Sequence, residues 1–155
     1  YLNSGGTQYS VSRITYHPSY NANTIVNDVA VVITSTAITA GTGIGTISLS
    51  TGTTGAGVSV RLVSPLQIHT LFHDSILPLS PNTLQKITLA TISDADCKSR
   101  LPRHPSVHTH QVWRGSLPRS SLVGVVSWGS PFARGYPNVF TRVSSFASWI
   151  NTNAQ

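Results

Sequence analysis

VSRITYHPSYNANTIVNDVAVV, residues 11–32, is the stretch of sequence that decides the fold. The run from Tyr9 to His17 alternates between two faces and then meets Pro18, so we expect a strand that ends in a turn. After an Asn-rich loop, residues 28–34 (DVAVVIT) form a β-branched run, which is typical of a strand buried on both faces. Asp28 stands at the mouth of this second strand.

Composition extends the strand pattern to the rest of the chain. Of 155 residues only 9% are charged and 39% are hydrophobic, and glutamate is absent, which favours an all-β domain. Gly-rich turns at 41–45 and 52–57 bracket one strand, and the strand-like runs continue to the C-terminal quarter. The further expected strands are 44–49, 58–63, 84–89, 122–127 and 139–143. Their spacing indicates a barrel or a sandwich.

Two helices interrupt the strands. Residues 93–100 begin with Ser93, carry acids in the first turn and bases in the last, and so suit the helix macrodipole at both ends. Phe146, Trp149 and Ile150 recur at i, i+3 and i+4 after Ser144 and Ser145. This spacing predicts an amphipathic C-terminal helix capped by a serine.

Segments 64–80 and 101–121 differ from the rest of the chain in composition. Five of the six histidines lie inside them, and no glycine lies between Val58 and Arg114, although strands there would need tight turns. We interpret both segments as foreign to the fold.

Four stretches together resemble the trypsin-like (chymotrypsin-type, S1) serine protease family. They are residues 11–32, 81–97 (PNTLQKITLATISDADC), 122–129 (LVGVVSWG) and 133–150 (ARGYPNVFTRVSSFASWI), and they cover about half of the chain in the family's order. The resemblance implies an antiparallel double β-barrel plus a C-terminal α-helix, with the catalytic cleft between the barrels. It divides a single partial domain, residues 1–155, into an incomplete first barrel (1–50), a second barrel (51–143) and the helix (144–155).

The resemblance gives Asp28 the place of the acid in a Ser-His-Asp triad, where it would orient an imidazole. Without the resemblance, an aspartate that opens a strand is usually a turn or cap residue. The family's histidine would lie before residue 1, and we interpret His17, next to Pro18, as a turn contact rather than a base. The motif G-D-S-G-G-P of the nucleophile is absent, and Ser116 lacks the following glycines that shape an oxyanion hole.

Ser127, Trp128 and Gly129 match the strand that pairs with the substrate backbone in the family. A plain barrel strand with an aromatic side chain in the core is the other interpretation of the same residues. The resemblance also shows two departures beside the neighbouring pocket. Asn138 stands where the family often has glycine, and its side chain would narrow the pocket; Phe132 stands where a cysteine of the pocket wall is expected. Cys97 is the sole cysteine, so the disulfide that the family would form at this position has no second half.

The resemblance therefore implies a secreted trypsin-like serine endopeptidase that acts on peptides or proteins without a cofactor. We expect this chain to be inactive, because the histidine and the G-D-S-G-G-P serine are missing. Two alternatives stay open: a non-catalytic homologue that binds proteins, and a weakly active protease that uses Ser116. The sequence assigns no oligomeric state.

Other partner classes are not favoured. The formal charge is +6 and the pI about 10.1, but the Lys and Arg residues are spread from Arg13 to Arg142, so we expect no nucleic-acid binding. His104, His108 and His110 have ligand-like spacing without the periodicity that would fix a site, and we expect no metal. We expect no membrane span, and neither the beginning of the family's domain nor a signal peptide is recognised in the sequence.

Overall fold

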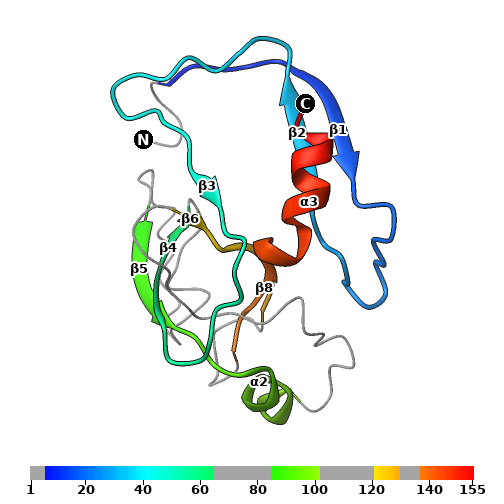
Figure 1. Ribbon diagram of the computed structural model, residues 1–155, viewed down its shortest axis with the longest axis vertical. Coiled ribbons are helices and arrows are strands. Elements are labelled where there is room, and N and C mark those ends of the chain that lie inside the picture. Colours follow the sequence, from blue (N-terminus) through cyan, green and yellow to red (C-terminus); the bar gives the residue numbers. More distant parts are fainter. Residues whose placement is uncertain (1–5, 65–84, 102–120, 130–136) are drawn as a thin grey trace, which may run out of the picture.

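The computed structural model describes residues 6–64, 85–101, 121–129 and 137–155. Strands dominate these residues, as the all-β prediction requires, and the two predicted helices are present (Figure 1). The strands are β1 (Val11–Tyr16), β2 (Ala30–Thr34), β3 (Ser48–Leu49), β4 (Ser59–Ser64), β5 (Gln85–Ala90), β6 (Ser121–Leu122), β7 (Gly124–Trp128) and β8 (Val139–Arg142). The helices are α2 (Asp94–Arg100) and α3 (Val143–Asn153).

The described strands pair two by two. β1 pairs with β2, β4 with β5 and β7 with β8, all antiparallel, as expected. β3 and β6 pair in parallel over two residues, which departs from the expected antiparallel arrangement. A parallel pair needs a long connection, and here more than seventy residues separate the two strands.

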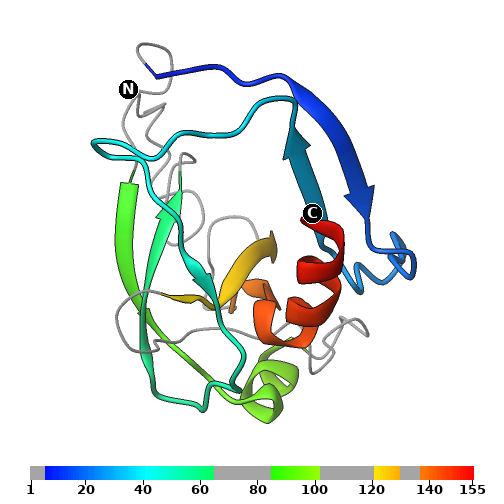
Figure 2. The ribbon, with the colours of Figure 1, turned by 45° about the horizontal axis from the view of Figure 1, so that its top comes forward.

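The strand β2 is buried on one face only, so the prediction of burial on both faces is wrong. Val31 is 9% exposed, whereas its neighbour Val32 is 54% exposed. Helix α3 lies beside the β1–β2 pair in both ribbon views (Figure 2). Among the described residues nothing comparable covers the face that carries Ile14 and Val32, which are paired across the two strands.

Helix α2 begins where its sequence predicts. The Asp96 backbone N–H donates to Ser93 Oγ at 3.0 Å, and Ser93 Oγ donates in turn to Asp96 Oδ2 at 2.6 Å. Acids occupy the first turn and bases the last. This reciprocal cap satisfies a backbone donor that a helix otherwise leaves without an intrahelical acceptor.

Helix α3 begins earlier than predicted and without the serine cap. Its N-cap residue is Arg142, whose side chain makes no capping hydrogen bond. The Val143 N–H instead donates to the Val123 carbonyl at 3.0 Å, and the Arg142 guanidinium reaches Asp94 Oδ1 at 3.2 Å. The helix therefore starts directly from the end of β8, because the neighbouring chain takes the first free N–H.

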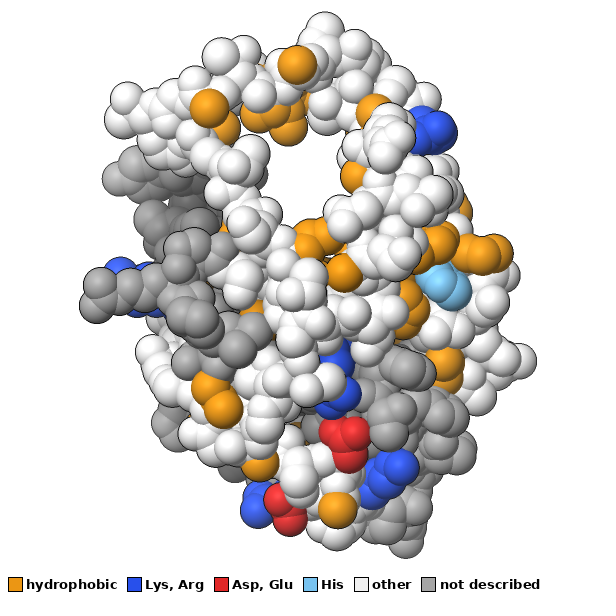
Figure 3. Space-filling model, viewed as in Figure 1, with side chains coloured by type: hydrophobic (Ala, Val, Ile, Leu, Met, Phe, Trp, Pro, Cys, Tyr) orange, Lys and Arg blue, Asp and Glu red, His pale blue; other side chains and the backbone are white. Residues whose placement is uncertain are grey.

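The buried core lies toward the C-terminal end of the sequence. Cys97, Leu101 and Val139 form one buried cluster, with Ile92 and Trp128 packed against it. Figure 3 shows that the upper part of the molecule is open, with hydrophobic side chains along the border of the opening. The division of the chain into an incomplete first barrel and a second barrel stays a prediction.

The two segments interpreted as foreign fall almost wholly outside the described residues. Only their boundary residues are described: Ser64 ends β4, Ser121 begins β6, and Leu101 is buried at the end of α2. These three residues take part in the fold. The interpretation of the residues between them stays a prediction.

Candidate functional site

Asp28 occupies a tight turn just before β2. The turn follows an isolated bridge between Asn21 and Val26. Asn27 has a left-handed backbone (φ 57°), its side chain donates to the Ser19 carbonyl at 2.9 Å, and the Val29 N–H donates to the Asn27 carbonyl at 2.9 Å. A non-glycine residue in this region persists only where its surroundings hold it. Asp28 thus lies in a constrained turn just outside the β1–β2 ladder.

The Asp28 carboxylate receives a short hydrogen bond from Ser127. Ser127 Oγ donates to Asp28 Oδ2 at 2.7 Å, across 99 positions of sequence. Ser127 lies in β7 at a register shift between Val126 and Trp128, where the antiparallel pairing with β8 is irregular. Bulges of this kind re-aim side chains. A hydroxyl donating to a carboxylate is among the stronger hydrogen bonds in proteins.

The Asp28 backbone is held separately by Thr141. Thr141 Oγ1 donates to the Asp28 carbonyl oxygen at 2.7 Å. Thr141 is 1% exposed and lies in β8, the strand that pairs with β7. Two hydroxyls from one strand pair therefore fix both the backbone and the side chain of one aspartate.

Trp128 and Gly129 continue the strand beyond Ser127. Trp128 is partly buried and packs against the cluster of Cys97, Leu101 and Val139. The Asn138 side-chain oxygen occupies the space that a Cβ on Gly129 would need. At position 129, the last residue of the predicted substrate strand, any residue other than glycine would require a shift of Asn138.

His17 is directed toward helix α3. The Ser19 N–H donates to His17 Nδ1 at 3.2 Å, and the ring lies 5.3 Å from the Phe146 ring and 5.0 Å from the Trp149 ring, measured between centroids. It is the only histidine among the described residues. These contacts engage the imidazole with its own turn and with α3, and they fit a structural role.

The other residues singled out in the sequence lie outside the described ranges. These are Ser116, Phe132 and the histidines from His69 to His110. Within 6–64, 85–101, 121–129 and 137–155, no group of His, Cys, Asp and Glu could hold a metal ion. No helix in those ranges is both long and apolar enough to cross a membrane.

The thiol of Cys97 is fully buried, and we expect it to be unreactive. Burial, with a smaller effect of the Asp94 charge, raises its pKa from the ordinary value of 9.0 to about 11, against a weaker opposing effect of Arg100. Because the thiolate is the reactive form, a thiol with this pKa is a poor nucleophile and a poor metal ligand. Cys97 is therefore a packing residue in this fold.

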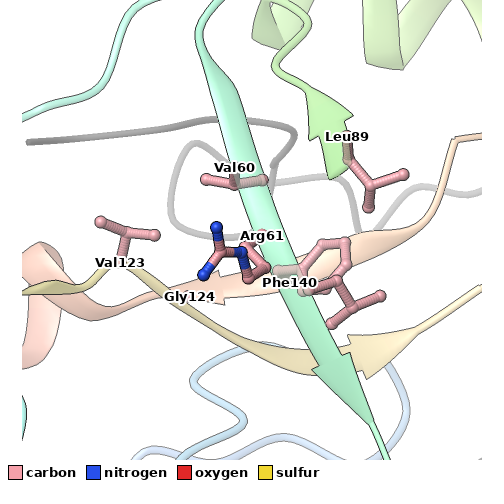
Figure 4. A pocket seen from close by; sticks show the side chains of 7 residues that line it. Val60, Arg61, Leu89, Val123, Gly124 and Phe140 are labelled. Atoms are coloured by element: carbon pink, nitrogen blue, oxygen red, sulfur yellow. The ribbon is translucent and has the colours of Figure 1, made fainter. Parts of the chain in front are cut away.

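A small cavity of about 40 Å³ lies between the β4–β5 and β7–β8 pairs (Figure 4). Its lining is apolar apart from one guanidinium and consists of Val60, Arg61, Leu62, Leu89, Val123, Gly124 and Phe140. The volume admits about one or two water-sized groups. It holds no carboxylate, imidazole or thiol from the described residues, so we do not place the site there.

Neither hydroxyl contact of Asp28 was expected from the sequence. The residues around Ser127 predicted a substrate strand, and nothing singled out Thr141. The signal lies in two mostly apolar strands, β7 and β8, that each carry a single hydroxyl residue. Only the register of the pair brings those hydroxyls to the same face.

Comparison with known proteins gives a consistent result. The sequence model of the family described as Trypsin matches residues 2–150. The chain is 30% identical to trypsin delta of Drosophila melanogaster over 99% of its length and 31% identical to trypsin I-P1 of Gallus gallus over 92%. It is also 30% identical to a chymotrypsin-like serine proteinase of Haliotis rufescens over 96% of its length. The chain spans between 62% and 65% of these three relatives.

Proposed function

The chain belongs to the trypsin family of serine proteases, and on that premise we propose that it carries the acid and the substrate-binding strand of a serine-endopeptidase site. We propose further that these 155 residues by themselves bind peptides weakly and do not cleave them. The substrates are peptides or proteins, in keeping with the family. Secretion, expected from the resemblance, belongs to the same proposal.

The hydrogen bond from Ser127 to Asp28 carries this proposal. A carboxylate that orients an imidazole must be fixed in rotation and must keep its charge. Ser127 Oγ binds Oδ2 at 2.7 Å and leaves Oδ1 without a hydrogen bond from the described residues. That oxygen is available to the N–H of an imidazole. The arrangement supports Asp28 as the orienting acid.

Strand β7, whose Ser127 bonds the Asp28 carboxylate, also suits the binding of a substrate backbone. Ser127, Trp128 and Gly129 are each partly exposed, and Gly129 directly follows the end of β7. An extended peptide binds such a strand by backbone hydrogen bonds, and neighbouring pockets select its side chains. Asn138 crowds Gly129 from one side. We therefore expect small substrate side chains to be favoured next to Gly129.

We expect no turnover because, in the described part of the chain, no base is positioned to accept the proton of a serine nucleophile. Serine attack on a carbonyl needs a base that accepts the hydroxyl proton. The His17 ring packs against α3, and its Nδ1 accepts from the Ser19 N–H. The sequence has no G-D-S-G-G-P run, and Ser116 lacks the glycines that follow a nucleophile in the family. Among the residues that the structure describes, no imidazole other than His17 is present to act as that base.

Two measurements on the purified chain test the proposal. Fluorogenic peptides that sample all residues before the scissile bond should release no more fluorophore than with heat-denatured protein. A pool of acetylated tripeptide amides, titrated into ¹⁵N-labelled protein, should shift the amide signals of residues 127–129 more than those of β8. Asn138→Gly removes the crowding at Gly129 and should strengthen the shifts several-fold.

Each readout has a contradicting result. Turnover that a serine-directed covalent inhibitor blocks, with the label mapped to Ser116, would make the chain an active protease. Shifts that avoid residues 127–129 and gather on another surface would favour the non-catalytic binding alternative.

A further inference from the structure

Asp28 has no place in a strand ladder that would hold its backbone. Its flanking residues form the tight turn in which the Val29 N–H bonds the Asn27 carbonyl, and β2 begins only at Ala30. Such a turn has few internal hydrogen bonds, and it can pivot unless something outside the turn holds it. The position of the Asp28 α-carbon therefore depends on contacts from elsewhere in the chain.

Thr141 supplies such a contact. Its hydroxyl bonds the Asp28 carbonyl at 2.7 Å, and its side chain is almost completely buried, with 1% exposure. Its neighbours in β8, Val139 and Phe140, are also buried but apolar. Valine has the same shape as threonine and would serve packing equally well at such a position. The hydroxyl is the feature that packing does not explain, because a buried hydroxyl is costly unless it is bonded.

The two hydroxyls act on different parts of one residue. Ser127 fixes the rotation of the Asp28 carboxylate, and Thr141 fixes the backbone from which that carboxylate extends. Thr141 pairs with Val125, two residues before Ser127 on β7, so both contacts come from a single strand pair, about two residues apart along it. If the backbone of Asp28 moved by more than a few tenths of an ångström, the 2.7 Å bond to Ser127 would lengthen or break.

We propose that Thr141 is a positioning residue for the site: through the Asp28 carbonyl it holds the carboxylate in reach of Ser127. The inference rests on the proposed role of Asp28 as the orienting acid. It adds a residue whose hydroxyl bonds the Asp28 carbonyl and neither the carboxylate nor residues 127–129. The effect of that hydroxyl on the site should therefore pass through Asp28.

The hydroxyl proton of Ser127 reports on this effect. In ¹³C-serine-labelled protein its exchange with solvent can be followed by NMR, and the Asp28 carboxyl carbon can be followed in the same variants. The carboxyl spectrum is simple, because the chain has four aspartates and no glutamate. Thr141→Val should speed exchange of the Ser127 hydroxyl proton about tenfold or more and move the Asp28 carboxyl signal, while β7–β8 amide exchange stays within about twofold.

Two further variants separate positioning from general stability. Thr141→Ser keeps the hydroxyl and should restore slow exchange at Ser127. Thr152→Val removes another threonine hydroxyl, an exposed one that donates to the Ser148 carbonyl at 3.0 Å in α3, and should leave both signals unchanged. If Thr141→Val lowers amide protection throughout the strand pair, Thr141→Ser becomes the deciding variant.

Unchanged Ser127 exchange in Thr141→Val, or fast exchange in Thr141→Ser, overturns the inference. The proposed function fails differently, through the peptide shifts at residues 127–129 and the turnover assay. Fast exchange of the Ser127 hydroxyl already in the unaltered chain contradicts both, because the Asp28–Ser127 bond would then be absent.

Discussion

The N-terminal region, residues 6–50, and the C-terminal region, residues 85–101, 121–129 and 137–155, are built from similar side chains but bury them differently. Of the eleven large hydrophobic residues that are exposed among the described residues, eight lie in the N-terminal region. Of the eight buried hydrophobic residues, seven lie in the C-terminal region and Val31 alone in the other. Strand-forming sequence is therefore not sufficient for a core.

The difference teaches what a strand pair needs. A two-stranded sheet is marginal in water unless something covers a face. β7 and β8 have Trp128 against the Cys97 cluster and continue directly into α3. β1 and β2 have α3 beside them, while Ile14 and Val32 remain about half exposed on the other face. We expect the stability of the described fold to reside mainly in the C-terminal region.

Truncation of one aromatic side chain in each region gives the largest expected contrast. Phe146 is 6% exposed in α3, and Phe146→Ala should lower the free energy of unfolding by about 3–5 kcal/mol. Tyr16 is 68% exposed in β1, and Tyr16→Ala should cost under about 1 kcal/mol. Urea denaturation followed by circular dichroism measures both. Equal losses would break the comparison.

The titration of Cys97 tests how completely the C-terminal core excludes solvent from the thiol. Its pKa is raised from 9.0 to about 11 in the folded chain. The pKa of Cys97 is higher in the folded chain than in the unfolded chain. The contribution of this shift to the free energy of unfolding is therefore complete below pH 9 and is lost as the pH rises toward 11. We expect a loss of about 2–3 kcal/mol across this window. Cys97→Ala should lack this part of the loss, and parallel pH profiles for the two proteins would contradict the assignment.

Val→Thr substitutions compare the two regions at nearly constant shape. Val139 in β8 is 0% exposed, and Val139→Thr buries a hydroxyl, with an expected cost of about 1–3 kcal/mol. Val32 in β2 is 54% exposed, and Val32→Thr should change the free energy of unfolding by less than about 0.5 kcal/mol. The same urea titration provides the measurement. A cost at Val32 as large as at Val139 would mean that β2 is covered on both faces after all.

Arg13 joins the two regions, and we expect its removal to have a small effect. Its guanidinium donates to the carbonyls of Asn153 and Gln155 at 3.0 and 2.9 Å, at the C-terminal end of α3. Removal of a cation from a helix C-terminus costs about 0.3–1 kcal/mol, so we expect that loss for Arg13→Ala. The loss should shrink in 1 M salt, which screens exposed charges over roughly 3 Å. A difference that salt leaves unchanged would point to packing by the aliphatic part of the side chain.

Local signals in the sequence predicted local structure well. Ser93 and the charges after it predicted the start of α2, and the alternating and β-branched runs predicted β1 and β2 with a few residues more than each strand has. The serine cap of α3 failed because the strand before it leads straight into the helix, so the Val123 carbonyl takes the first N–H. A signal within three or four residues cannot include that partner.

The candidate site, too, was predictable only where the signal is local. Asp28 could be proposed as the triad acid, because its neighbours in sequence match the family's pattern. The contacts from Ser127 and Thr141 were not, since they depend on the register of β7 against β8 and on a bulge at one position. Burial of β2 was also misjudged, because a β-branched run shows strand propensity but not what covers each face.

The hydrogen bonds of Asp28 close long loops, and this affects how the chain folds. They join residues 99 and 113 positions apart, whereas the β4–β5 and β7–β8 pairs join closer segments. Contacts that close longer loops cost more entropy before they stabilise anything, and they tend to slow folding. We expect the strand pairs and α2 to form first and Asp28 to dock last. Refolding measured by a probe at Ser127, which reports the docking of Asp28, should then be slower than refolding measured by circular dichroism, which reports secondary structure.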